Sequence, residues 1–130
     1  MVFGMAMITP LKRARGLGSA HEGADHFLKQ RFTGAANAIL AAFAVGLIAT
    51  LAGADLATVR ATLAHPLVAA ALLALIVSMC VHMRIGMQVI IEDYVHSDGL
   101  KVLLLLGNNL FAGAIAAVSI FAVLKLSFGG

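Results

Sequence analysis

The sequence predicts an all-α membrane protein with three transmembrane helices, and two observations support this prediction. The chain of 130 residues is 62% hydrophobic and only 12% charged, with a mean hydropathy of +1.01, whereas soluble domains carry about 45–50% apolar and about 25% charged residues. The charged residues also leave three long intervals without any charge, 32–54, 61–83 and 102–124. This composition excludes a soluble enzyme, a secreted disulfide scaffold and a disordered tail.

Each charge-free interval is long enough to cross a membrane as a helix. At a rise of ~1.5 Å per residue each interval spans roughly 34 Å, more than the ~30 Å thickness of a hydrocarbon core. Backbone amides in lipid must pair within their own segment, so helices are expected. We predict helices over about 32–54, 61–92 and 102–124, in a transmembrane anchor unit over 32–130 that follows a basic cytoplasmic segment, 1–31.

The distribution of Lys and Arg predicts the orientation of the chain. Five such residues precede the first predicted helix, whereas the following loop has only Arg60 and the C-terminal end only Lys125. Basic residues favour the cytoplasmic side, so the N-terminus is expected there and the C-terminus across the membrane. The basic segment favours contact with anionic membrane lipid, and nothing in the pattern indicates nucleic acid. The lack of an Arg- and Ser-rich presequence favours a bacterial inner membrane over a mitochondrial one.

Polar side chains at membrane depth stand out in the second predicted helix. His82 and Arg84 lie close together in an otherwise apolar span, and such residues are costly in lipid and commonly mark a functional site. At ~100° per residue, Gly86 and Asp93 lie near the direction of His82, and Arg84 points roughly opposite. Tyr94 lies about 120° away from His82. Gly86 is expected to leave room for a flat cofactor against the helix.

Spacing alone leaves three uses open for the His82 imidazole: an interhelical hydrogen bond, a proton relay or a metal ligand, for example to haem iron. His65 is seventeen residues away on the same predicted helix. At ~26 Å it is too far to bind the same iron. If His82 binds haem, the second axial ligand therefore comes from a partner helix, which predicts a heteromer or a homodimer.

Two motifs link the chain to a known family. His82 is followed by Gly86, by Gln88 and by the run 93–96 (Asp-Tyr-Val-His), and the segment 26–33 (His-Phe-Leu-Lys-Gln-Arg-Phe-Thr) precedes the first helix. In these motifs, its length and its three predicted helices, the chain resembles the D-type hydrophobic membrane-anchor subunits of succinate dehydrogenase, the respiratory complex II. The resemblance covers most of the chain, and the motif in the second helix is its more specific part.

The resemblance implies a division of labour within a larger complex. Anchors of this family pair with a second haem-ligating anchor subunit, share one haem b with it, and dock an iron–sulfur subunit and a flavoprotein subunit. His82 occupies the position of the axial ligand to the haem iron. Tyr94 and Asp93 occupy positions of the ubiquinone site, and Arg31 and His26 lie at the periphery of the haem propionates or of the quinone pocket. The implied function is the membrane anchor of succinate:ubiquinone oxidoreductase, with no catalytic residue and no activity alone.

Other hypotheses stay open at this point. A fumarate reductase anchor that works with menaquinol has similar features, because the direction depends on potentials and on the quinone pool. A small transporter or proton-pathway subunit would use His82 and Asp93 without haem, and a structural scaffold would not need His82. Tyr94 is also compatible with an interfacial aromatic anchor, and Asp93, His26 and Arg31 with charges at the membrane boundary.

Overall fold

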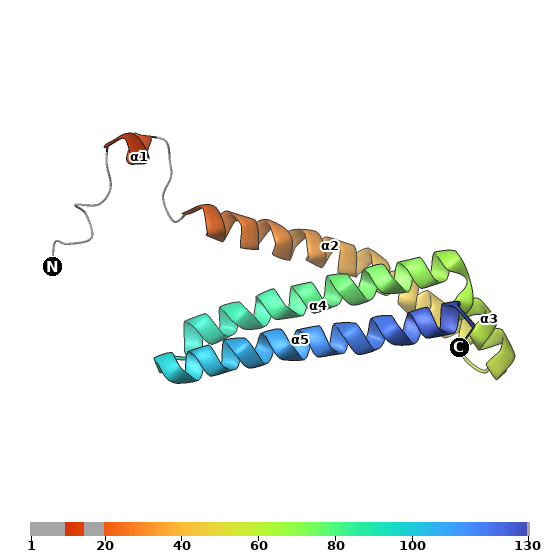
Figure 1. Ribbon diagram of the computed structural model, residues 1–130. Helices are drawn as coiled ribbons and strands as arrows, with labels where there is room; N and C mark the ends of the chain where they lie inside the picture. The colour runs from red at the N-terminus through yellow and green to blue at the C-terminus, as the bar shows by residue number, and fades with distance from the viewer. Residues whose placement is uncertain (1–9, 15–19, 130) are drawn as a thin grey trace.

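The computed structural model describes residues 10–14 and 20–129, which are helical apart from short connections (Figure 1). Its helices are α1 (Pro10–Ala14), α2 (Ala20–Leu51), α3 (Leu56–Ala64), α4 (Pro66–Tyr94) and α5 (Asp98–Ser127). Three segments are long and apolar enough to cross a membrane: Gly23–Leu51, Pro66–Tyr94 and Asp98–Ser127. The predicted all-α fold with three membrane-spanning helices is confirmed.

The first long helix begins and ends at different residues from those that the charge-free interval suggested. α2 begins at Ala20 instead of at 32, so the expected boundary at residue 31 falls inside a continuous helix. Charges do not end a helix that has reached the membrane surface, and the exposed pair of Asp25 and Lys29, four residues apart, supports this turn. α2 ends at Leu51 because Gly53 follows with φ of 81°, a left-handed conformation that closes helices.

The second membrane-spanning helix begins at Pro66 instead of at 61, because the chain first forms the separate short helix α3. Proline has no backbone N–H and a fixed φ, which suits the first turn of a helix. The Nδ1 atom of His65 accepts a hydrogen bond from the Leu67 N–H at 3.3 Å and caps this start. At the start of α3, the Thr58 hydroxyl donates to the Asp55 carboxylate, which lowers the pKa of Asp55 below its ordinary value.

α4 is the central helix of the bundle. It packs against α2 on one side and α5 on another, and α3 folds across α4 and α5 at the end where α5 stops (Figure 1). The apolar side chains that are buried among the described residues are Ala69, Leu75, Ile85, Ile91 and Ala112. Large apolar side chains are exposed along all three long helices, as expected of a surface that faces lipid or other subunits.

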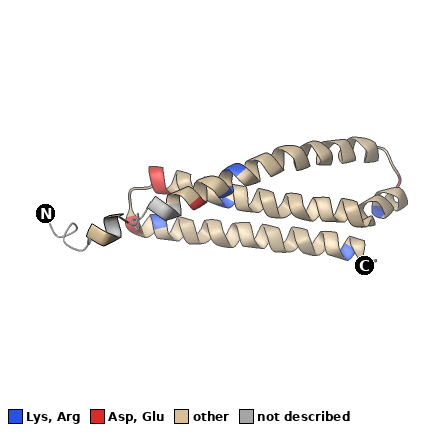
Figure 2. Ribbon diagram, turned by 90° about the horizontal axis from the view of Figure 1, so that it is seen from above, with Lys and Arg blue, Asp and Glu red and all other residues tan. Residues whose placement is uncertain are grey.

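Charged side chains gather toward one end of the bundle. Figure 2 shows most of them where α2 begins, α4 ends and α5 begins. The opposite end carries Asp55, Arg60 and Lys125. The chain therefore has a polar, charge-rich end and a sparsely charged end, separated by apolar helix.

Candidate functional site

His82 lies on the side of α4 that faces α2. Its Nδ1 atom is 3.1 Å from the Oγ1 atom of Thr33. The Thr33 hydroxyl also lies 2.8 Å from the carbonyl oxygen of Lys29 and 3.2 Å from that of Gln30, so it donates its single proton to its own helix. The hydroxyl oxygen then accepts from Nδ1–H of His82, which leaves the lone pair on Nε2. Nε2 forms no hydrogen bond within the described part of the chain.

The two helices approach closely at this point. A Cβ atom on Gly34 would lie 3.4 Å from Cε1 of His82. The Ser78 hydroxyl donates to the carbonyl oxygen of Thr33 at 3.2 Å. One of the three uses left open for His82, an interhelical hydrogen bond, is therefore present. Because this bond uses only Nδ1, it leaves Nε2 available as a metal ligand.

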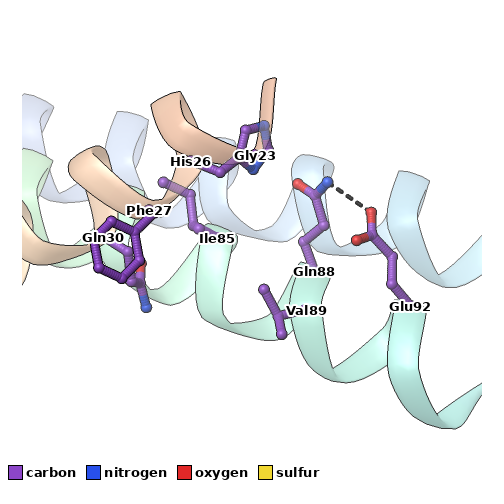
Figure 3. Close-up of a pocket in the computed structure, with 8 residues that line it drawn as sticks. All are labelled: Gly23, His26, Phe27, Gln30, Ile85, Gln88, Val89 and Glu92. Atoms are coloured by element: carbon purple, nitrogen blue, oxygen red, sulfur yellow. Dashed lines mark hydrogen bonds between the residues drawn. The ribbon is translucent and has the colours of Figure 1, made fainter. Parts of the chain in front are cut away.

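A groove opens between α2 and α4 on the same side of α4, toward the C-terminal end of that helix. This α2–α4 groove has a volume of about 490 Å³. Its lining, drawn in Figure 3, consists of Gly23, His26, Phe27, Gln30, Ile85, Gln88, Val89 and Glu92. The amide nitrogen of Gln88 donates to the Glu92 carboxylate at 2.8 Å. The groove thus combines polar side chains with an apolar wall at the charge-rich end of the bundle.

Gly86 plays a different part from the one expected. A Cβ atom at Gly86 would lie 3.2 Å from the Nε2 atom of Gln30, so the space beside this glycine holds a side chain of α2. In the structure, the Gln30 side chain thus lies where a flat cofactor against the helix was expected. The Oε1 atom of Gln30 is buried and has no hydrogen-bond partner among the described residues. A buried oxygen without a donor is costly in free energy.

Of the two predicted periphery residues, His26 and Arg31, only His26 lines this groove. The guanidinium carbon of Arg31 lies 5.3 Å from the centre of the Phe27 ring, and Phe27 is itself part of the wall. The structure therefore places His26 on the side of α4 that faces α2, whereas Arg31 is exposed and does not line the groove.

Tyr94 lies elsewhere, at the end of a second groove between α4 and α5. This α4–α5 groove has a volume of about 660 Å³. Its lining includes Met83, Met87, Ile90, Tyr94, Gly107, Asn108 and Phe111. The Tyr94 side chain is 77% exposed, and the neighbouring Asp93 is exposed at the end of α4 and lines neither groove. The site residues predicted from the sequence thus lie in different places. His82 and His26 lie on the α2 side of α4, Tyr94 lies at the α4–α5 groove, and Asp93 lies at the exposed end of α4.

Sequence reasoning included Thr33 and Gln30 only as members of the 26–33 motif and gave neither a role. A signal was present, because His26, Gln30, Thr33 and Asn37 follow one another at spacings of four, three and four residues. This spacing places polar side chains on one face of a helix. Arg84, which was expected to point roughly opposite to His82, is exposed, and its carbonyl oxygen accepts from the Asn108 amide at 2.8 Å.

The described side chains contain no group of three or more His, Cys, Asp or Glu residues placed to hold a metal ion. A metal bound by Nε2 of His82 would take its remaining ligands from a cofactor or from another chain. Together these features define a class of protein: a multi-pass membrane protein with a half-buried histidine held between two of its helices.

Comparison of the sequence with known protein families identifies the family of this chain. The family model described as succinate dehydrogenase/fumarate reductase transmembrane subunit matches residues 5–124, and the chain belongs to this family. This result confirms the resemblance found in the sequence motifs.

Curated relatives agree with the family match. The chain is 27% identical over 125 residues to the succinate dehydrogenase hydrophobic membrane anchor subunit of Paracoccus denitrificans, covering 96% of each chain. The subunit of the same name from Rickettsia bellii is 28% identical over 100 residues, which is 77% of this chain and 80% of the relative. The one from Rickettsia conorii is 32% identical over 100 residues, with coverage of 76% and 79%. No solved structure matches the chain significantly.

Proposed function

We propose that the chain is the membrane-anchor subunit of a succinate:ubiquinone oxidoreductase in a bacterial inner membrane. It pairs with a second haem-ligating anchor subunit and docks the iron–sulfur and flavoprotein subunits. The relatives from Paracoccus and Rickettsia, all named as succinate dehydrogenase anchors, support this function over that of a fumarate reductase anchor. The charge-rich end, where α2 begins, faces the cytoplasm and the soluble subunits.

The hydrogen bond between His82 and Thr33 is the observation that carries this proposal. Histidines that bind metals donate their other ring N–H to an acceptor, which fixes the tautomer and the orientation of the ring. Here Nδ1 is held by Thr33 at 3.1 Å, and the half-buried ring has Nε2 left for the iron of haem b. Haem, when bound, would supply a one-electron redox centre. The donor set of this face therefore fits a haem with a second axial ligand from the partner anchor.

The α2–α4 groove supports the same proposal. Haem carries two propionates, and carboxylates in an apolar site need cationic or N–H donors. His26 in the groove supplies such a group on the α2-facing side of α4, and the exposed Arg31, next to Phe27 of the groove wall, would supply a second one from the surface of α2. In this proposal His26 and Arg31 would hold the haem propionates. The partner anchor would cover the α2–α4 groove.

In this proposal Tyr94 serves the quinone at the α4–α5 groove, and Asp93 supports the site from the exposed end of α4. Reduction of a quinone to a quinol takes two electrons, which come from succinate through the other subunits, and two protons. Tyr94 donates a hydrogen bond from its hydroxyl to a quinone carbonyl oxygen, which polarises that carbonyl as electrons arrive. Asp93, exposed beside it at the end of α4, accepts protons from water and passes them toward the site.

Variants of Thr33 test whether its hydrogen bond with His82 orients a haem ligand. Thr33→Val removes the acceptor for Nδ1–H with little change in volume, so the imidazole becomes a poorer electron donor to iron. We expect haem to stay bound and its midpoint potential to rise by roughly 20–60 mV, the equivalent of one hydrogen bond of about 0.5–1.5 kcal/mol. Redox titration of the assembled complex measures this shift.

Two matched variants control that experiment. Thr33→Ser keeps the hydroxyl and is expected to keep the wild-type potential. Ser78→Ala removes the other interhelical bond, to the Thr33 carbonyl, without touching the ring, and is expected to leave the potential unchanged. A Thr33→Val complex with the wild-type potential would show that this hydrogen bond does not orient a haem ligand.

A further inference from the structure

We infer that Arg84 binds the phosphate group of an anionic phospholipid, in the membrane leaflet at the charge-rich end of the bundle. Arg84 is exposed on α4 and lines neither the α2–α4 groove nor the α4–α5 groove. Helical periodicity turns it about 160° away from His82, the residue of the proposed haem site. The inference therefore goes beyond the proposed function, and it depends on neither haem nor quinone.

The packing of α2 against α4 places Arg84 at one level with Arg31. The two helices run antiparallel, and the contact between Thr33 and His82, at 3.1 Å, ties them together (Figure 1). Arg31 lies two residues from Thr33, and Arg84 lies two residues from His82, both toward the charge-rich end. Both arginines therefore lie ~3 Å beyond this contact.

This level coincides with the edge of the hydrocarbon core. From Arg31 to Leu51, where α2 ends, twenty steps of ~1.5 Å give roughly 30 Å, the thickness of the core. α2 carries no charge over 32–51, whereas its exposed ion pair lies just beyond Arg31. Exposed ions of this kind are costly within hydrocarbon. The core therefore ends at the level of Arg31 and Arg84, where the lipid headgroups begin.

The charge of Arg84 has no counter-ion within the described part of the chain. Its guanidinium takes part in no hydrogen bond or ion pair there, and only its carbonyl oxygen is bound, by the Asn108 amide. The nearest carboxylate along α4, that of Glu92, is eight residues away, or ~12 Å, and accepts from Gln88. An arginine at the edge of lipid needs an anion, and its planar fork of N–H donors matches a phosphate group.

The surface of α4 next to Arg84 is apolar and suits an acyl chain. Val81 and Val77, three and seven residues before Arg84, share its face and are 36% and 48% exposed. They extend ~10 Å from Arg84 toward the middle of the membrane. A basic group at the edge of the core, followed by apolar side chains, matches the order of a phospholipid head and its tail. The positive charge favours an anionic lipid over a zwitterionic one.

Photocrosslinking of the assembled complex tests this site in a membrane. The probe is phosphatidylglycerol with a photoreactive group on its acyl chain, present in vesicles of phosphatidylcholine, and labelled peptides of this chain are identified by mass spectrometry. In the wild-type complex we expect the probe to label the α4 segment 77–84. Excess unlabelled phosphatidylglycerol should suppress this labelling, whereas additional phosphatidylcholine should not.

Variants of Arg84 test whether its charge selects the lipid. Arg84→Gln should lower the labelling of this segment about fivefold, the contribution of one basic residue near anionic lipid. Arg84→Lys keeps the charge and should keep most of the labelling. Arg60→Gln is the matched control, because Arg60 is an exposed arginine on α3, at the opposite end of the bundle, and should leave the labelling unchanged.

Other outcomes would overturn the inference. Equal labelling of wild type and Arg84→Gln would show that Arg84 selects no lipid. An unlabelled segment in an intact wild-type complex would show that another subunit covers this face, with an acidic side chain in place of the phosphate. Failure of Arg84→Gln alone to assemble would show the same protein contact, since loss of one lipid contact leaves the subunit interfaces unchanged.

Discussion

Replacement of His82 by alanine is expected to remove most of the haem b from the assembled complex. The imidazole on the α2 side of α4 keeps the lone pair of Nε2 free, and the hydrogen bond of Nδ1 fixes the ring. Loss of a partner that only orients a ligand costs about 10–100-fold in metal affinity, and loss of the ligand itself costs at least as much. The haem-to-flavin ratio of the purified complex should therefore fall at least tenfold.

The same helix provides the control. His65 caps the opposite end of α4 through the Leu67 N–H, and His65→Asn keeps a side chain that caps helices well. This variant should keep the wild-type haem-to-flavin ratio. Unchanged haem content in an assembled His82→Ala complex would remove His82 as the ligand and favour a proton-pathway or scaffold role.

Replacement of Tyr94 by phenylalanine is expected to lower quinone reduction strongly while leaving haem in place. The ring and its position at the end of α4 are retained, and only the donor to the quinone carbonyl is lost. A positioned donor of this kind contributes about 10²-fold or more when it also assists proton transfer, so kcat/KM for ubiquinone should fall roughly 10- to 100-fold. Steady-state kinetics of succinate-dependent ubiquinone reduction measure the effect.

Two readouts keep this prediction specific. Succinate oxidation with a soluble dye as electron acceptor should stay at the wild-type rate, because the dye takes electrons before the membrane site. The reduced haem spectrum should also be unchanged, since Tyr94 lines the α4–α5 groove and His82 faces α2. Wild-type ubiquinone kinetics in Tyr94→Phe would leave the exposed hydroxyl without a role in quinone reduction.

The membrane-spanning helices could be predicted because about 20 apolar residues without charge are enough to span the hydrocarbon core, and lipid favours the helix for such a segment. Their ends could not be predicted in the same way, since a helix continues past the lipid boundary until a local signal stops it. Gly53 and Pro66 are such signals, and both lie close to the interval ends. Nothing comparable lies near residue 31, so α2 extends back to Ala20.

Helical periodicity also separated His82 from Tyr94 by about 120°. The structure confirms that they face different neighbours, α2 and α5 respectively. The periodicity of one helix gives directions but not the element that covers each face. For this reason Thr33, the partner of His82 on another helix, could not be assigned from the motif around His82.

A reduced-minus-oxidised absorption spectrum of the gently solubilised wild-type complex tests the central claim most directly. We expect a b-type haem signal that is reduced by succinate, with one haem for each anchor pair. An intact, succinate-oxidising complex that contains this chain and shows no haem signal would contradict the claim that His82 is an axial haem ligand.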